Sequence, residues 1–107
     1  MSLMRRLFSS AYRRARRAEG RGEYREAAAL YAEAEAWDKL AHTYERLLPH
    51  ALDTEERVTI QSNWAMVLAD GLGDIPGALA LYDQILEEAP EDKEAFQAML
   101  ALQKRAE

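Results

Sequence analysis

Residues 59–90 of this 107-residue chain have the pattern of two helices that each need a neighbour to pack against. Apolar residues recur at helical spacing over 60–69 and again over 78–86. A short turn containing Gly71 and Gly73 separates the two runs, and Pro90 ends the second. Small residues alternate with large and aromatic ones, so two antiparallel helices can approach closely. The pattern predicts a helix hairpin that stacks on further hairpins.

The composition favours helix along nearly the whole chain. Only 5 glycines and 3 prolines occur, 49% of the residues are hydrophobic and 31% are charged. The absence of cysteine excludes a disulfide framework and a thiolate zinc site. No apolar run approaches the roughly 20 residues that a membrane-spanning helix requires. We therefore predict an all-α domain in the cytoplasm, with no cofactor.

The first half of the chain is predicted to hold three helices. The first covers about residues 3–19 and ends at a glycine-containing turn. The second covers about residues 23–36, with an apolar stripe of alanine and tyrosine. Asp38 is the predicted N-cap of the third, which stops before Pro49 because proline disfavours helical geometry in the preceding residue.

The second half is predicted to hold three more helices. Asp53, with Glu56 three residues later, resembles a capping box for a helix that ends near Asp70. Asp74 is expected to cap the next helix, and Pro76 is compatible with its first turn. The last helix follows Pro90. Its predicted buried face consists of Ala95, Phe96, Met99, Leu100 and Leu102.

The net charge of -5 hides an uneven distribution. Residues 1–25 carry eight arginines against two acids, a balance of +6, whereas residues 26–107 carry six basic residues against seventeen acids, a balance of -11. A basic first helix could bind an anionic membrane surface, nucleic acid or the acidic body of another copy, or could simply be solvated. Nucleic acid is disfavoured because the acidic body would repel phosphates. The candidate basic residues are Arg5, Arg6, Arg13, Arg14, Arg16 and Arg17.

Two segments share one pattern at a constant offset of 51 residues. Gly22, Ala27, Tyr31 and Ala34 in the first segment correspond to Gly73, Ala78, Tyr82 and Ile85 in the second. The second segment, with its Gly73-Asp74 turn, small Ala78, aromatic Tyr82 and closing Pro90, resembles the tetratricopeptide repeat. It departs from that pattern at Met66, where a small residue is usual.

This resemblance implies a right-handed α-α superhelix, a solenoid of about six antiparallel helices. The whole chain, 1–107, would form a single domain. Residues 1–22 would be a basic N-terminal helix, 23–50 a degenerate repeat, 53–90 the best repeat and 91–107 a C-terminal capping helix.

In such repeats the first helix of each pair lines a concave groove, so the resemblance also implies candidate partner-binding residues. Asn63 is the most suggestive, because an amide can donate to and accept from an extended peptide backbone. An equally simple interpretation makes Asn63 a solvated helix residue. The full candidate set is Arg25, Glu26, Ala29, Asn63, Val67, Asp70, Gln97 and Ala101.

The sequence offers no convincing catalytic or metal-binding arrangement. His42 and His50 lie on either side of Pro49 without an evident ligand set, and Ser62 has no identifiable base. We therefore expect a non-enzymatic scaffold or adaptor that binds a peptide or helix of another protein. The alternatives are a homo-oligomer that associates through its terminal helices and a peripheral membrane or polar-scaffold adaptor tethered by the basic helix.

Overall fold

The computed structural model describes residues 9–107, which contain six α-helices and no strand. This confirms the all-α prediction for that part of the chain. The first eight residues, which include Arg5, Arg6 and the beginning of the first predicted helix, lie outside the described residues. The chain divides into two units, Met1–Pro49 and His50–Glu107. The helices are α2 (Ser10–Gly20), α3 (Tyr24–Glu33), α4 (Trp37–Leu47), α5 (Thr54–Met66), α6 (Ile75–Glu88) and α7 (Lys93–Arg105).

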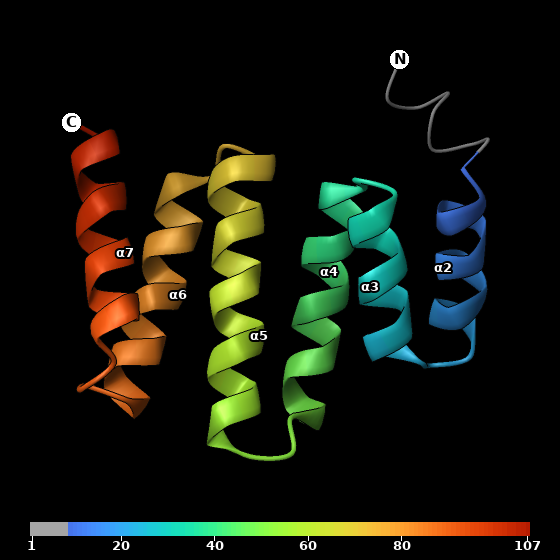
Figure 1. Ribbon diagram of the computed structural model, residues 1–107, viewed down its shortest axis with the longest axis horizontal. Helices are drawn as coiled ribbons and strands as arrows, with labels where there is room; N and C mark the ends of the chain where they lie inside the picture. Colours follow the sequence, from blue (N-terminus) through green and yellow to red (C-terminus); the bar gives the residue numbers. More distant parts are fainter. Residues whose placement is uncertain (1–8) are drawn as a thin grey trace. The chain divides into compact units, whose positions relative to one another are not determined.

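In the first unit, α3 is the central helix and packs against both α2 and α4 (Figure 1). Alanines at Ala15, Ala18 and Ala27 are completely buried, so the α2 and α3 backbones come close together. Tyr31 fills the space beside them and is also completely buried. Its ring meets that of Tyr12 edge-on, with 5.7 Å between centroids.

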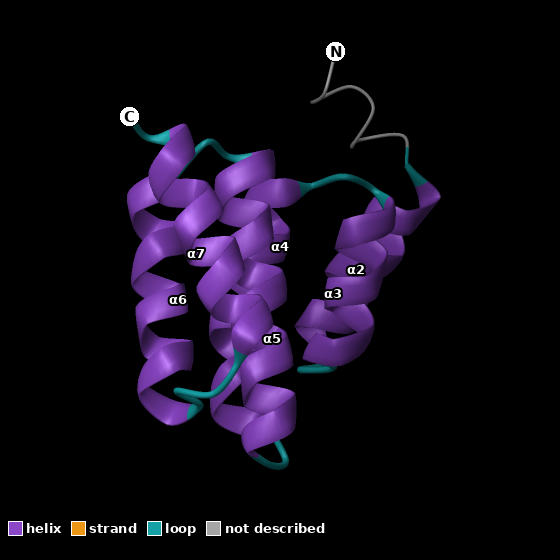
Figure 2. Cartoon of the chain, turned by 60° about the vertical axis from the view of Figure 1, so that its left-hand side comes forward, coloured by secondary structure: helices purple, strands orange, loops and turns teal. Residues whose placement is uncertain are grey.

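The second unit repeats this plan, with α6 packed against both α5 and α7. Figure 2 draws all of its segments as helices and loops. Its core has Ala65 and Ala78 fully buried, and Tyr82 beside them is 4% exposed. Trp64 is partly buried and packs against this core. The core therefore again places small residues beside one tyrosine of the central helix, and Leu81, Ile85 and Leu102 complete it.

The turns before the two central helices are also related by the 51-residue offset. Gly22 has a φ of 74° and Gly73 a φ of 69°, a left-handed conformation that glycine adopts without steric cost. Each glycine ends the turn that leads into the central helix of its unit. The central helices differ in length, because α3 has 10 residues and α6 has 14.

A π-helical turn, Val67–Gly71, follows α5 and accounts for another difference between the units. There the Leu72 amide donates to the Val67 carbonyl five residues back, at 3.1 Å. Upstream of this turn, buried Ala65 corresponds to Ala15 at an offset of 50 rather than 51. The π turn thus accommodates one extra residue without turning the buried face of α5 away from α6.

Side-chain caps begin several helices. The Asp53 carboxylate accepts from the Glu56 amide at 2.8 Å, and the Asp74 carboxylate accepts from the Gly77 amide at 3.0 Å. Both predicted caps are confirmed. The second hydrogen bond of the predicted capping box differs. The Glu56 carboxylate accepts from the Leu52 amide rather than from the Asp53 amide.

Three predictions in the first unit need correction. Asp38 is not an N-cap, because α4 begins at Trp37 with Ala36 in the capping position, and Asp38 lies in its first turn. The second helix ends at Glu33 rather than near residue 36, since Glu35 takes a left-handed φ of 55°. The helix predicted over about residues 3–19 is not continuous, because Ser9 has an extended backbone and is the N-cap of α2. The Ser9 hydroxyl accepts from the Tyr12 amide at 3.1 Å.

The predicted buried face of the last helix is also partly wrong. Ala95 and Leu102 are buried, and Met99 packs against the core. Phe96 and Leu100, however, are 48% and 47% exposed. The α7 helix packs mainly against α6, and Phe96 and Leu100 lie outside the face that this packing covers.

Replacement of Ala78 by leucine should destabilise the protein. No space exists for a larger side chain at this completely buried position, so the free energy of unfolding should fall by about 1–3 kcal/mol. Urea denaturation followed by circular dichroism measures this. Ala80→Leu, at an exposed position two residues along the same helix, is the control and should change stability little. Equal losses would contradict the close packing of α5 and α6.

Two glycines at the α2–α3 turn should respond oppositely to alanine. Gly22→Ala forces a side chain into the left-handed region and should cost about 1–2 kcal/mol. Gly20 is helical with open space around the position of a Cβ, so Gly20→Ala should stabilise by up to about 1 kcal/mol. Thermal unfolding of both variants distinguishes them. A stabilising Gly22→Ala would show that this turn is not left-handed.

Candidate functional site

Two hollows lie between α5 and α7 in the second unit, and we refer to them together as the α5–α7 groove. The first hollow has a volume of about 480 Å³ and the second about 270 Å³. The first is lined by Thr54, Glu55, Val58, Thr59, Ser62, Asn63, Ile85, Ala89, Glu91, Asp92, Glu94 and Ala95. The second is lined by Met66, Ala69, Asp70, Tyr82, Ala98, Ala101, Leu102 and Arg105.

The groove arises from the order of the helices and from the small residues of α7. The α5 and α7 helices run in the same direction because α6 returns between them (Figure 1). Ile85 and Tyr82 of α6 contribute to the two hollows. Ala95, Ala98 and Ala101 face the hollows from α7 with only a methyl group each. The missing side-chain volume leaves the space open.

Polar groups of α5 form one wall of the first hollow. Thr59 donates its hydroxyl to the Glu55 carbonyl at 3.0 Å, and Ser62 forms a hydrogen bond with Tyr82. Asn63 is exposed beside them. Its amide presents both a donor and an acceptor to whatever enters the hollow.

Carboxylates surround the first hollow. Glu55 projects from α5, and Glu91 and Glu94 flank the start of α7; all three are exposed. Asp92 accepts from the Ala95 amide at 3.1 Å and so caps α7. No lysine or arginine is among the residues that line this hollow. The entrance therefore has a negative potential.

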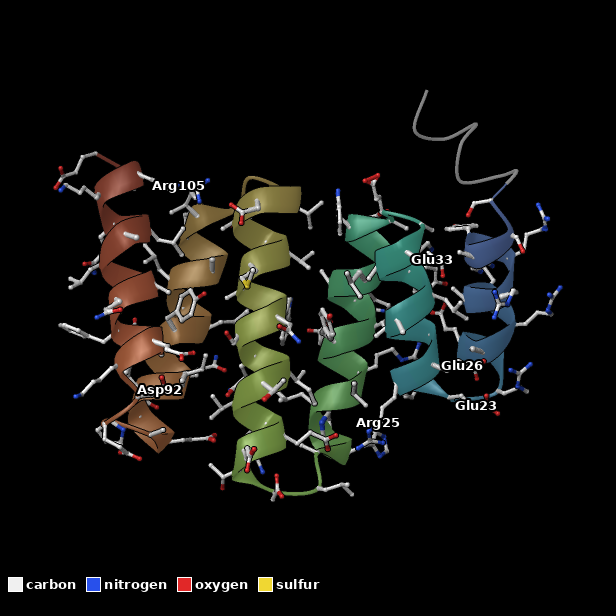
Figure 3. All side chains as sticks on the ribbon, viewed as in Figure 1. Glu23, Arg25, Glu26, Glu33, Asp92 and Arg105 are labelled. Carbon is white, nitrogen blue, oxygen red and sulfur yellow. The ribbon has the colours of Figure 1, made fainter. Side chains whose placement is uncertain are left out.

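An ion pair spans the second hollow at the other end of α7. Arg105 Nη1 lies 2.9 Å from Asp70 Oδ1, and both side chains are exposed. Figure 3 shows Asp92 near the beginning of α7 and Arg105 near its end. The groove is thus acidic near the start of α7 and closer to neutral near its end.

Tyr82 lies in the second hollow with its hydroxyl near polar neighbours. Burial raises the pKa of Tyr82, the hydrogen bond with Ser62 lowers it, and the nearby charge of Asp70 raises it. Tyr31 occupies the corresponding place in the first unit, where its hydroxyl donates to Glu19. Burial is also the main cause of the raised pKa of Tyr31.

The residues predicted on α5 and α7 reach the groove in part. Asn63 lines the first hollow, and Asp70 and Ala101 line the second. Val67 is half-buried in the π turn and lines neither hollow. Gln97 is exposed and lines a separate hollow of about 320 Å³ with Phe96 and the turn before α7. Of these five predicted residues, Asp70 and Ala101 therefore line one hollow together, and Asn63 lines the other.

The three predicted residues on α3 belong to the first unit and line none of these hollows. Arg25 and Ala29 are exposed. Glu26 lies 3.7 Å from Arg21, which is 3.1 Å from Glu23 (Figure 3). Hydrogen bonding between the two carboxyl groups raises the pKa of Glu26, while the guanidinium of Arg21 lowers the pKa of Glu23.

Several groove residues were not predicted from the sequence. Glu55 and Thr59 precede Asn63 by eight and four residues, so the helical repeat of α5 could have located them on the same face. Glu91 and Glu94 carried no comparable signal. Only the packing of α7 beside α5 places these two residues at the groove.

Among the basic candidates, Arg13, Arg14, Arg16 and Arg17 are exposed on α2. A hydrogen bond with Tyr12 raises the pKa of Arg16. Within residues 9–107, no helix is long and apolar enough to cross a membrane. The same residues hold no group of three or more histidine, cysteine or acidic side chains that could bind a metal ion.

Comparison with known proteins gives no relative. No family model matches the sequence, and neither a curated protein nor a solved structure matches it significantly.

The buried tyrosines should make the protein less stable at alkaline pH. Their raised pKa keeps them protonated in the folded chain, whereas tyrosines of the unfolded chain ionise near pH 10. Their contribution is complete below pH 10 and is lost as the pH rises further, so the free energy of unfolding should fall. Urea denaturation between about pH 8 and 11 measures this. Tyr82→Phe should show a shallower fall, and an unchanged slope would contradict the assignment.

Proposed function

We propose that this chain is a non-enzymatic adaptor of the tetratricopeptide-like class that binds a segment of another protein in its α5–α7 groove. The observation that carries the proposal is the open space between two parallel helices, with an alanine-lined wall on α7 opposite polar groups on α5. A cytoplasmic location belongs to the same proposal.

The helix order supports this class. In each unit a central helix packs against both flanking helices, and the left-handed glycines and buried tyrosines recur at the offset of 51 residues. Repeats of this kind bury their apolar faces by stacking, and helices of the same direction then line one surface. A right-handed α-α superhelix belongs to the same proposal.

The chemistry of the groove supports a protein segment as its ligand. The first hollow, at about 480 Å³, lies within the range of volumes that binding pockets occupy. Val58 and Ile85 offer apolar contact, while Asn63 can form hydrogen bonds with a peptide backbone. Such a mixture suits an extended segment or a helix that presents side chains of both kinds.

Blocking the first hollow should abolish partner binding without unfolding the protein. Asn63→Trp places a large ring at its wall from an exposed position. Affinity capture with the full chain, followed by mass spectrometry, should recover a partner with the wild type. We expect the Asn63→Trp variant to recover at least ten-fold less of that partner.

Ala80→Trp is the matched control, because Ala80 is exposed on α6 and lines none of the described hollows. It should recover the same partner as the wild type. Circular dichroism checks that both variants are folded. Retention of the partner by folded Asn63→Trp would refute the groove as the binding site.

A further inference from the structure

The two units carry opposite net charges. Residues 1–49 contain ten lysines and arginines against seven acids, a balance of +3. Residues 50–107 contain four basic residues against twelve acids, a balance of -8. The same chain thus carries a cationic and an anionic surface, and two copies can bring them together.

The anionic surface is concentrated at the first hollow. Glu55, Glu91 and Glu94 are exposed around it, and no basic residue lines it. Two of the four basic residues in this unit form ion pairs elsewhere. Arg57 lies 3.6 Å from Glu88, and Arg105 lies 2.9 Å from Asp70. The acids of the hollow are therefore not neutralised by these two cations.

The cationic surface is the outward side of α2. Ala11, Ala15 and Ala18 turn inward and are buried. Arg13 and Arg17 lie one turn apart on the opposite side of the helix and are exposed. Arg14 is exposed beside them, so α2 presents a row of guanidinium groups that suits a row of carboxylates.

We infer that the α5–α7 groove binds the arginine-rich α2 surface of a second copy of this chain. The inference rests on the proposed function, since it names the protein that occupies the same groove. Donor surface and acceptor groove are different parts of the chain, so the contact is head-to-tail. In a pair of copies joined in this way, one groove and one α2 surface stay unoccupied. Further copies can therefore add, which gives a ring or an open chain.

Self-association should depend on protein concentration and on salt. The mean mass of the full chain, measured by sedimentation equilibrium at about 20 mM salt, should rise above 12.2 kDa as concentration increases. At about 500 mM salt it should return to that of one chain, because exposed charges are screened. A single-chain mass at every concentration in low salt would overturn the inference.

Two charge variants identify the surfaces. The groove variant carries Glu55→Gln, Glu91→Gln and Glu94→Gln, and the helix variant carries Arg13→Gln, Arg14→Gln and Arg17→Gln. Each should have the mass of one chain by itself. Mixed in equal amounts, they should form a dimer and nothing larger, because one intact groove then meets one intact α2. Failure to dimerise on mixing would contradict a head-to-tail contact.

A third variant controls for net charge. Asp83→Asn, Glu87→Gln and Glu107→Gln remove three exposed acids that do not line the first hollow, and this variant should associate like the wild type. Equal loss of association would attribute the effect to overall charge and overturn the inference. The dimer formed on mixing also shows that both charge variants are folded.

A fluorescent nona-arginine peptide separates this inference from the proposed function. The chain could bind the peptide without self-associating, and the groove variant could lose that binding. This result would overturn the inference that a second copy occupies the groove. It would leave the groove as a site for a basic segment of another protein. If neither the peptide nor another copy binds, the inference falls. The capture experiment with Asn63→Trp then decides the proposed function independently.

Discussion

The fold depends on one recurring contact, a buried tyrosine on a central helix surrounded by alanines. Tyr31 and Tyr82 can reach the helix before them only because Ala15, Ala18, Ala65 and Ala78 keep the backbones close. Each hydroxyl finds a polar partner on that preceding helix, Glu19 in one unit and Ser62 in the other. These hydrogen bonds offset the cost of burying the hydroxyls. They also fix how far one helix can slide along its neighbour.

Small residues also create the groove, because alanines on α7 face α5 without filling the space between the two helices. Where alanines of two helices meet, the backbones close up, as in the α5–α6 pair. Where alanines of α7 face α5 across α6, no helix is close enough to fill the gap, and a hollow remains. Alanine therefore accounts both for the close packing of α5 and α6 and for the open space of the groove. The carboxylates around the hollow then determine the sign of the charge that it attracts.

Local signals in the sequence predicted most of the helices, because caps and left-handed turns act over a few residues. Asp53, Asp74 and the two turn glycines all behave as their residue types suggest. Burial was harder to predict, since it depends on which neighbours are present. Phe96 and Leu100 have helical spacing and apolar character, yet stay exposed because they lie outside the face of α7 that packs against α6. Asn63 could be placed at the groove from the repeat pattern, whereas Glu91 and Glu94 required the packing of α7.

Because of the π turn at Val67–Gly71, the α5 segment can be one residue longer without a change in which of its faces is buried. In a regular α-helix an inserted residue rotates everything on one side of it by about 100° relative to the other. Here the wide turn takes up the extra residue at the end of the helix, where Ala65 before the turn and Ala69 within it are both buried. Two hairpins of similar plan can therefore differ in length by one residue while the same faces stay in contact. An alignment that assumes a constant repeat length would lose register at that turn.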